Sequence, residues 1–127
     1  MTPIKASWLA ALVGGEGTWK YRKSKSRSPK KDYYYWRLRI EIEMKEEEWV
    51  QRDAILFGVK HRRIPKTGAW EAAVEGYRAF SIVEQIRPHL LGMKAKGAEI
   101  ILGSGPTLAI TEPRPLLPNI KSRRDMN

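Results

Sequence analysis

Residues 33–45 alternate strictly between two kinds of side chain. The even positions are Tyr34, Trp36, Leu38, Ile40, Ile42 and Met44, and the odd positions are Tyr33, Tyr35, Arg37, Arg39, Glu41, Glu43 and Lys45. A period of two over this length predicts a β-strand with one face on a hydrophobic core and one face in solvent. The strand therefore belongs to a sheet that is covered on one side only.

The segments around this strand predict three helices and three further strands. Residues 18–27 alternate as a strand, and the polar segment 24–32 predicts a hairpin loop. Three glutamates at 46–48 favour a helix N-terminus by complementing the macrodipole, and Gly58 is expected to end that helix. Residues 59–64 and 69–77 predict a second hairpin, and residues 79–90 recur at helical spacing until Pro88 ends the helix. The predicted class is α+β in the order α-β-β-α-β-β-α over residues 1–102, followed by an irregular, basic, Pro-containing tail over residues 103–127.

The N-terminal segment is an uncharged run from Ala6 to Gly15 that predicts a helix with two different faces. At about 100° per residue, the large apolar residues fall on one face and the small ones on the other. The small-residue face consists of Ser7, Ala10, Ala11 and Gly14. Small residues let another backbone approach closely, so both faces are expected to be buried. Gly14, Gly15 and Gly17 are expected to end the helix, with Glu16 as the only charge among them.

The charge balance indicates a polyanionic partner. The 127 residues form one domain with 24 Lys+Arg against 14 Asp+Glu, a net charge of +10, and nucleic acid is the commonest polyanion. The lack of cysteine excludes disulfide scaffolds, cysteine-ligated zinc sites and thiol chemistry. No apolar run approaches the roughly 20 residues of a membrane span, and no signal-peptide pattern opens the chain. We therefore expect an intracellular protein, cytoplasmic in a prokaryote or organellar in a eukaryote.

Residues 8–17, Trp-Leu-Ala-Ala-Leu-Val-Gly-Gly-Glu-Gly, resemble the signature of the LAGLIDADG homing endonucleases. Further stretches at 37–42, 58–59, 68–70 and 93–98 follow the same family in order and spacing. The resemblance implies an αββαββα fold in which helices cover one face of an antiparallel, saddle-shaped sheet. Only one copy of the signature is present, and single-motif members work as homodimers. The resemblance therefore implies a homodimer that is held together by the small-residue face.

The same resemblance implies a metal-dependent double-strand cut in a long pseudo-palindromic DNA target. The last acid of the signature is Glu16, which is expected to bind Mg²⁺ or Mn²⁺ together with Gly15. Mg²⁺ prefers one or two carboxylates with phosphate oxygens and waters, so one Glu16 from each subunit is sufficient. Lys94 matches a basic residue near the scissile phosphate, and Lys96 is the next candidate. Glu43 matches a polar position that organises active-site water, where the family commonly has Gln.

A basic surface is predicted to contact the DNA. Residues 18–39 carry nine Lys or Arg against the single Asp32, and the odd face of strand 33–45 can address base edges. Arg forks onto guanine and Glu accepts from cytosine. The predicted DNA contacts are Lys20, Arg22, Lys23, Lys25, Arg27, Lys30, Lys31, Tyr35, Arg37, Arg39, Glu41 and Glu71. The resemblance adds His61 and Arg63, because the pattern of residues 59–64 leaves their orientation ambiguous.

Three alternatives use the same residues. Glu43-Met44-Lys45 contains the Glu-x-Lys of the PD-(D/E)xK nucleases, but that interpretation leaves the signature helix unexplained. Members of the LAGLIDADG family also act as maturases that help their host intron splice, so host intron RNA is a second partner to consider. The sequence does not separate cleavage from maturase activity cleanly, although the retained Glu16 favours cleavage. A transcription regulator of this fold would usually add a helix-turn-helix domain, for which 127 residues leave no room.

Overall fold

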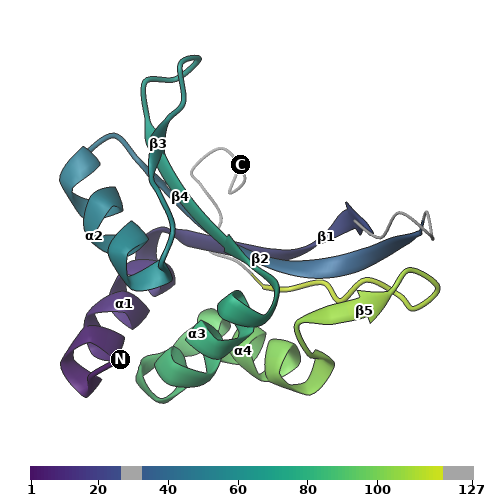
Figure 1. The fold of residues 1–127 in the computed structure, drawn as a ribbon. Coiled ribbons are helices and arrows are strands. Elements are labelled where there is room, and N and C mark those ends of the chain that lie inside the picture. The colour runs from purple at the N-terminus through teal and green to yellow at the C-terminus, as the bar shows by residue number, and fades with distance from the viewer. Residues whose placement is uncertain (27–32, 119–127) are drawn as a thin grey trace, which may run out of the picture.

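The computed structural model describes residues 1–26 and 33–118 (Figure 1). Its elements are helix α1 (Pro3–Glu16), strands β1 (Gly17–Lys25) and β2 (Tyr34–Met44), helix α2 (Glu47–Phe57), strands β3 (Arg62–Arg63) and β4 (Trp70–Glu75), helix α3 (Gly76–Ile86), the 3₁₀ turn η1 (Arg87–His89), helix α4 (Gly92–Ser104) and strand β5 (Thr107–Ala109). The α+β class and the predicted order through α3 are confirmed. No helix in the described ranges is long and apolar enough to cross a membrane.

The strands form one antiparallel sheet in the order β1-β2-β4-β3, and β5 pairs with β2. The register aligns apolar residues in rows across the sheet, with Trp19 opposite Ile40 and Ile40 opposite Val74. The helices lie together on one side of this sheet, and its other face is open and curved (Figure 1). The predicted one-sided sheet is therefore confirmed, and the open face is available to a large ligand.

The core lies between the sheet and the helices. The sheet contributes the buried side chains Trp19, Tyr21, Leu38, Ile40, Ile42, Ala72 and Val74, and the helices contribute Leu9, Val13, Val50, Phe57, Val83, Ile86 and Ile101. Leu38, Ile40 and Ile42 of β2 are fully buried, as the alternation predicts. Burial of this apolar face favours the one-sided architecture.

The first helix ends at Gly17, one of the three glycines expected to end it, but the expectation was wrong for Gly14 and Gly15. Helix α1 continues through Gly14 and Gly15 to Glu16, and Gly17 begins β1 directly with an extended backbone (φ −84°, ψ 153°). A Cβ on Gly17 would lie 2.8 Å from the Val13 carbonyl oxygen and 3.1 Å from Cδ1 of Ile42. Glycine is therefore required at 17 because helix and strand meet there with no space between them. This junction fixes the position of Glu16.

Ala10 does not belong to the exposed small-residue face. It is buried in the core of its own subunit together with Ala6, Leu9 and Val13. Ser7 and Ala11 are exposed, and a Cβ on Gly14 or Gly15 would meet no atom within 4 Å. The predicted interface role of Ala10 was therefore wrong, because the helix turns this residue into the core.

The segment after α4 is less irregular than predicted. Strand β4 leaves β2 after the Arg39–Glu75 pair, and β5 takes its place along the same edge, where Thr107 pairs with Arg37. Side chains also fasten the segment, since the Tyr21 hydroxyl donates to the Gly105 carbonyl at 2.7 Å and Trp36 Nε1 donates to the Glu112 carbonyl at 3.0 Å. A three-residue strand beside several prolines carries too short a pattern to be predicted.

Candidate active site and nucleic-acid interface

Glu16 and Glu43 come together in one groove, as the resemblance implied. The groove has a volume of about 520 Å³ and lies where the end of α1, the end of β2 and the β3–β4 turn meet. Its lining residues are Glu16, Glu43, Met44, Lys45, Glu46, Thr67 and Ala69. Both carboxylates are exposed, and neither forms an ion pair with a residue that the structure describes. Two unpaired acids therefore face the same space at the edge of the open sheet face.

The donor atoms at this position fit a hard divalent cation. The carbonyl groups of the last turn of α1, including that of Gly15, lack the intrahelical partners of mid-helix carbonyls. The Glu16 side chain adds a carboxylate to the same helix end and lines the groove. Oxygen donors of this kind suit Mg²⁺ or Mn²⁺, which keep waters and phosphate oxygens as further ligands. Residues 1–26 and 33–118 contain no cluster of three acidic or His side chains that could enclose a metal ion. The geometry thus fits an open site that takes its remaining ligands from outside the described residues.

Lys94 is buried against the start of β1, which directly follows Glu16 in the chain. Its Nζ donates to the Gly17 carbonyl at 2.6 Å and lies 5.0 Å from the centre of the Trp19 ring. The side chain is only 2% exposed, and burial lowers its pKa to about 8. Lys94 therefore holds the carbonyl of Gly17, the residue that follows Glu16. Lys96 is exposed on α4, and no contact within the described residues ties it to the groove.

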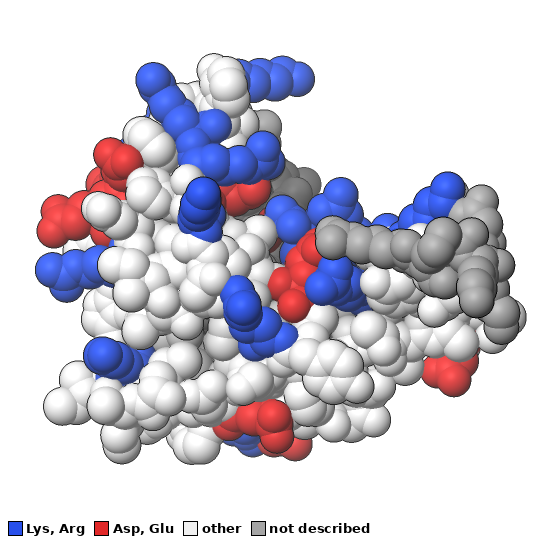
Figure 2. Space-filling view, in the orientation of Figure 1, with Lys and Arg blue, Asp and Glu red and all other residues white. Residues whose placement is uncertain are grey.

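Most of the predicted contact residues lie on the open face of the sheet. The regular register places Lys20, Arg22, Tyr35, Arg37, Arg39, Glu41 and Glu71 on the side opposite the buried Trp19, Ile40 and Val74. Basic side chains gather at the β3–β4 end and along the β1–β2 end, with acidic side chains between them (Figure 2). The orientation predicted from the alternation of β2 is confirmed.

Lys23 and Lys25 lie on the other side of β1. They share the parity of Trp19 and Tyr21, and the Lys23 Nζ lies 4.7 Å from the centre of the Tyr34 ring. Their predicted contacts with phosphate stay a prediction. Arg27, Lys30 and Lys31 fall outside the described residues.

The predicted orientation of His61 and Arg63 was wrong. The His61 ring lies 5.4 Å from the Trp70 ring, and its Nε2 lies 3.0 Å from Glu47 Oε2 on α2. The register pairs Arg63 with Trp70 and Arg62 with Glu71, so Arg62 shares the open face. A shift of one residue reverses every side chain of a strand, and residues 60–63 are all polar and give no signal for its parity.

An ionic network fills the centre of the open face. Arg39 bonds Glu41 through Nε at 2.9 Å and Glu75 through Nη1 at 3.2 Å, and its Nη2 lies 3.6 Å from Glu71. Burial works against the charge of Arg39, but the bonds and charges of Glu41 and Glu75 outweigh it and raise the Arg39 pKa. Arg62 bonds Glu71 at 3.1 Å. Sequence reasoning missed Glu75, although it continues the outward alternation of Glu71 and Ala73.

Comparison with solved structures identifies the fold as that of the LAGLIDADG homing endonucleases. The homing endonuclease I-CvuI, solved in complex with its target, is 19% identical with a TM-score of 0.64, and the match covers 80% of this chain and 65% of that one. The homing endonuclease I-TnaI is 18% identical with a TM-score of 0.54, covering 78% of this chain and 67% of that one. The LAGLIDADG homing endonuclease I-LtrWI, bound to target DNA, is 15% identical with a TM-score of 0.56, covering 78% of this chain and 35% of that one.

No protein-family model matches this sequence, and no curated protein matches it. The chain spans 65% of the length of I-CvuI. The fold and order of elements leave the Glu-x-Lys of residues 43–45 at the end of β2, in a sheet of LAGLIDADG type. The PD-(D/E)xK interpretation is therefore not supported.

Proposed function

We propose that this protein is a site-specific homing endonuclease that makes a metal-dependent double-strand cut in a long pseudo-palindromic DNA target. The observation that carries the proposal is the position of Glu16. It is an acid without an ion-pair partner among the described residues, it ends the signature helix, and it opens onto a groove beside a sheet face rich in Arg. A net charge of +10 supports a DNA partner.

The chemistry follows from the groups in this groove. Hydrolysis of a phosphodiester builds extra negative charge on the phosphate. A divalent cation, when bound, activates water and stabilises the leaving oxygen. The Glu16 carboxylate and the Gly15 carbonyl would hold it, and Glu43 would accept a hydrogen bond from the attacking water. Lys94 would keep the backbone at Gly17, the residue after Glu16, in place through its bond to the Gly17 carbonyl.

The proposal includes a homodimer with one Glu16 from each subunit. The face of α1 formed by Ser7, Ala11 and Gly14 is open, and a hollow of about 320 Å³ between α1 and α2 continues it. Ile4 and Ile55 line this hollow and are 83% and 72% exposed. Exposed apolar groups next to small residues favour close packing of a second copy.

The assembly is tested by light scattering at micromolar concentration. We expect twice the chain mass of 14.6 kDa, and we expect monomers after Ala11→Glu, which places a charge on the open face. A wild-type mass of 14.6 kDa would contradict the homodimer.

Cleavage is tested with a library of randomised duplex DNA in Mg²⁺. The wild-type protein should enrich one pseudo-palindromic family of cut sequences. Glu16→Gln should abolish cutting and leave affinity for the enriched sequence within about tenfold, because the amide loses the cation without disturbing the sheet face. Glu84→Gln, an exposed position on α3, is the matched control and should cut normally. Enrichment of no cut sequence by the wild type would refute the proposal.

We place this activity inside the cell, where the DNA of the host is found. Binding of host intron RNA stays a prediction from the resemblance.

A further inference from the structure

Two arginines stand side by side on the open face and both contact the carboxylate of Glu75, which also bonds Arg39 at 3.2 Å. Arg22 on β1 is the direct cross-strand neighbour of Arg37 on β2. Like charges in this position repel each other. Glu75 at the end of β4 contacts both, with Oε1 3.7 Å from Arg22 Nη1 and Oε2 3.5 Å from Arg37 Nη1. Glu75 therefore offsets the repulsion between the two arginines, and its hydrogen bond to Arg37 limits the rotamers of that side chain.

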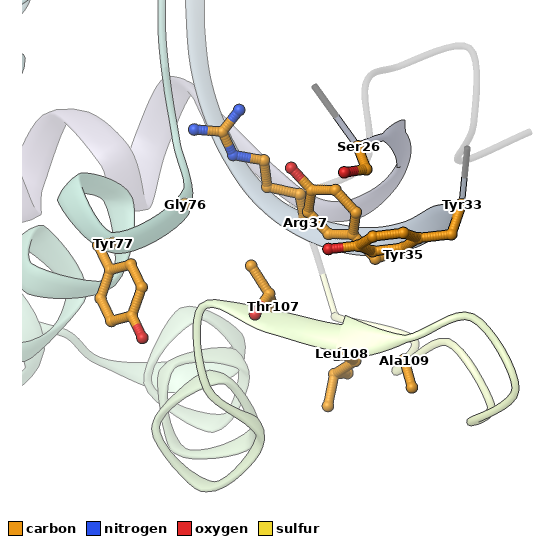
Figure 3. A pocket seen from close by; sticks show the side chains of 9 residues that line it. All are labelled: Ser26, Tyr33, Tyr35, Arg37, Gly76, Tyr77, Thr107, Leu108 and Ala109. Atoms are coloured by element: carbon orange, nitrogen blue, oxygen red, sulfur yellow. The ribbon is translucent and has the colours of Figure 1, made fainter. Parts of the chain in front are cut away.

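The backbone beside Glu75 restricts Arg37 further. Gly76 begins α3 with φ +66°, and a Cβ there would lie 2.8 Å from Arg37 Nε and 3.0 Å from Nη2. The Arg37 guanidinium thus lies against the Gly76 backbone, beside a hollow of about 640 Å³ between β2, β5 and the start of α3 (Figure 3). Glu75 is the N-cap residue of α3, yet its side chain makes no capping bond. Its carboxylate forms ion pairs with the arginines instead.

Arg39 differs from these two residues because its donors are already engaged. Each of its three guanidinium nitrogens faces a different carboxylate, and the side chain is 15% exposed, against 32% for Arg37 and 55% for Arg22. A bidentate bond to guanine needs two nitrogens of one guanidinium. Arg39 would have to leave two carboxylates to form it. In Arg37, Nε and Nη2 have no carboxylate partner among the described residues.

We propose that Glu75 is a positioning residue for DNA sequence recognition, which orients Arg37 and Arg22 toward guanine edges, and that Arg39 is held by carboxylates and reads no base. This inference rests on the proposed function and deepens it. It replaces the predicted base contact of Arg39 with one by Arg22, and it requires guanines at two positions in each half-site.

The test is a binding selection from randomised duplex DNA at two salt concentrations. It compares the wild type, Glu75→Gln, Arg37→Lys and Glu99→Gln. Glu99 pairs with Arg87 away from the sheet, so this control adds the same charge without touching the arginines of the open face. Arg37→Lys keeps the positive charge but cannot form a bidentate bond to guanine. Circular dichroism establishes that each variant is folded, and Glu75→Asp, which keeps the charge but shortens the side chain, replaces Glu75→Gln if that variant does not fold.

We expect Glu75→Gln to lose roughly 5- to 150-fold discrimination at the guanine positions that Arg37→Lys also loses. Affinity for unrelated DNA should stay the same or rise, as it should for Glu99→Gln, whose base preference should equal that of the wild type. An unchanged base preference in Glu75→Gln, or equal loss in Glu99→Gln, would overturn the positioning role while leaving the proposed function intact. A wild type that selects no sequence would overturn the proposed function and this inference with it.

Discussion

Asp53 is a buried acid that should make folding strongly dependent on pH. It lies on the inner face of α2 with Val50, Ala54 and Phe57, is 0% exposed, and neither carboxyl oxygen has a hydrogen-bond partner in the described structure. Burial raises its pKa from 3.8 to about 8. The folded protein therefore keeps a proton on Asp53 that the unfolded chain gives up at neutral pH.

The sign and size of the effect follow from linkage. Between pH 3.8 and about 8 the folded state binds more protons at this group. Stability from Asp53 is fully present below that window and falls as the pH rises through it. At pH 7 the loss is about 4 kcal/mol, a large part of the 5–15 kcal/mol that holds a typical domain together. Asp53→Asn has nearly the same shape and the same unbonded polar atoms as the protonated acid, so it removes the pH term alone.

Urea unfolding followed by circular dichroism at pH 5.5 and 7.5, at constant ionic strength, measures this term. Asp53→Asn should be more stable than the wild type at both values. Its advantage should grow by roughly 2–3 kcal/mol between them. Glu84→Gln on the surface of α3 controls for the loss of one acid and should show no such growth. An advantage that does not change with pH would show that folded Asp53 is ionised and would refute the reasoning.

Three further substitutions test other contacts. Tyr21→Phe removes the donor to the Gly105 carbonyl and should lower the free energy of unfolding by about 1 kcal/mol in urea titration, whereas no loss would mean that the bond does not fasten the segment before β5. Gly17→Ala places a methyl 2.8 Å from the Val13 carbonyl oxygen and should cost about 1–3 kcal/mol, whereas Gly103→Ala, with open space around it on α4, should not destabilise. Lys94→Met keeps the length of the side chain but loses the hydrogen bond to the Gly17 carbonyl. We expect the cleavage rate to fall on the order of 10²-fold while DNA affinity is retained. Parallel loss of cleavage and of DNA affinity would indicate a purely structural role.

The sequence predicts those parts of the fold that have a long hydrophobic pattern or a glycine that ends a helix. The alternation through β2 sets both its buried side and its open side, and Gly58, with φ +72°, ends α2 where expected. Patterns of two or three residues do not carry such information. Strand β3 is two residues long and lies among polar neighbours, so the one-residue error at His61 and Arg63 could only be resolved by its pairing with β4.

The sequence predicted the two acids of the candidate site, but not the ion pairs that organise the arginines beside it. Glu16 and Glu43 follow from the resemblance, but the partners of an Arg depend on which strands are adjacent. Glu75 is 36 residues from Arg39 and reaches it only because β4 pairs with β2. Asp53 had a readable signal, since it falls at helical spacing among Val50, Ala54 and Phe57, where a charged residue is unexpected.

The distribution of charge on the open face separates attraction from recognition. At the centre, Arg22, Arg37, Arg39 and Arg62 are matched by Glu41, Glu71 and Glu75, so this region carries little net charge. In the proposed function, the excess positive charge that attracts DNA therefore lies outside this network, on exposed lysines such as Lys60 and Lys66. Phosphate contacts by such residues set the salt dependence without distinguishing sequences. The balanced centre gains little from non-specific attraction. An Arg that leaves its Glu for DNA loses the energy of that ion pair, and only a bond to a well-placed base replaces it. A wrong base leaves that cost unrecovered. If the proposed function holds, this is how a strongly basic protein can still discriminate between DNA sequences.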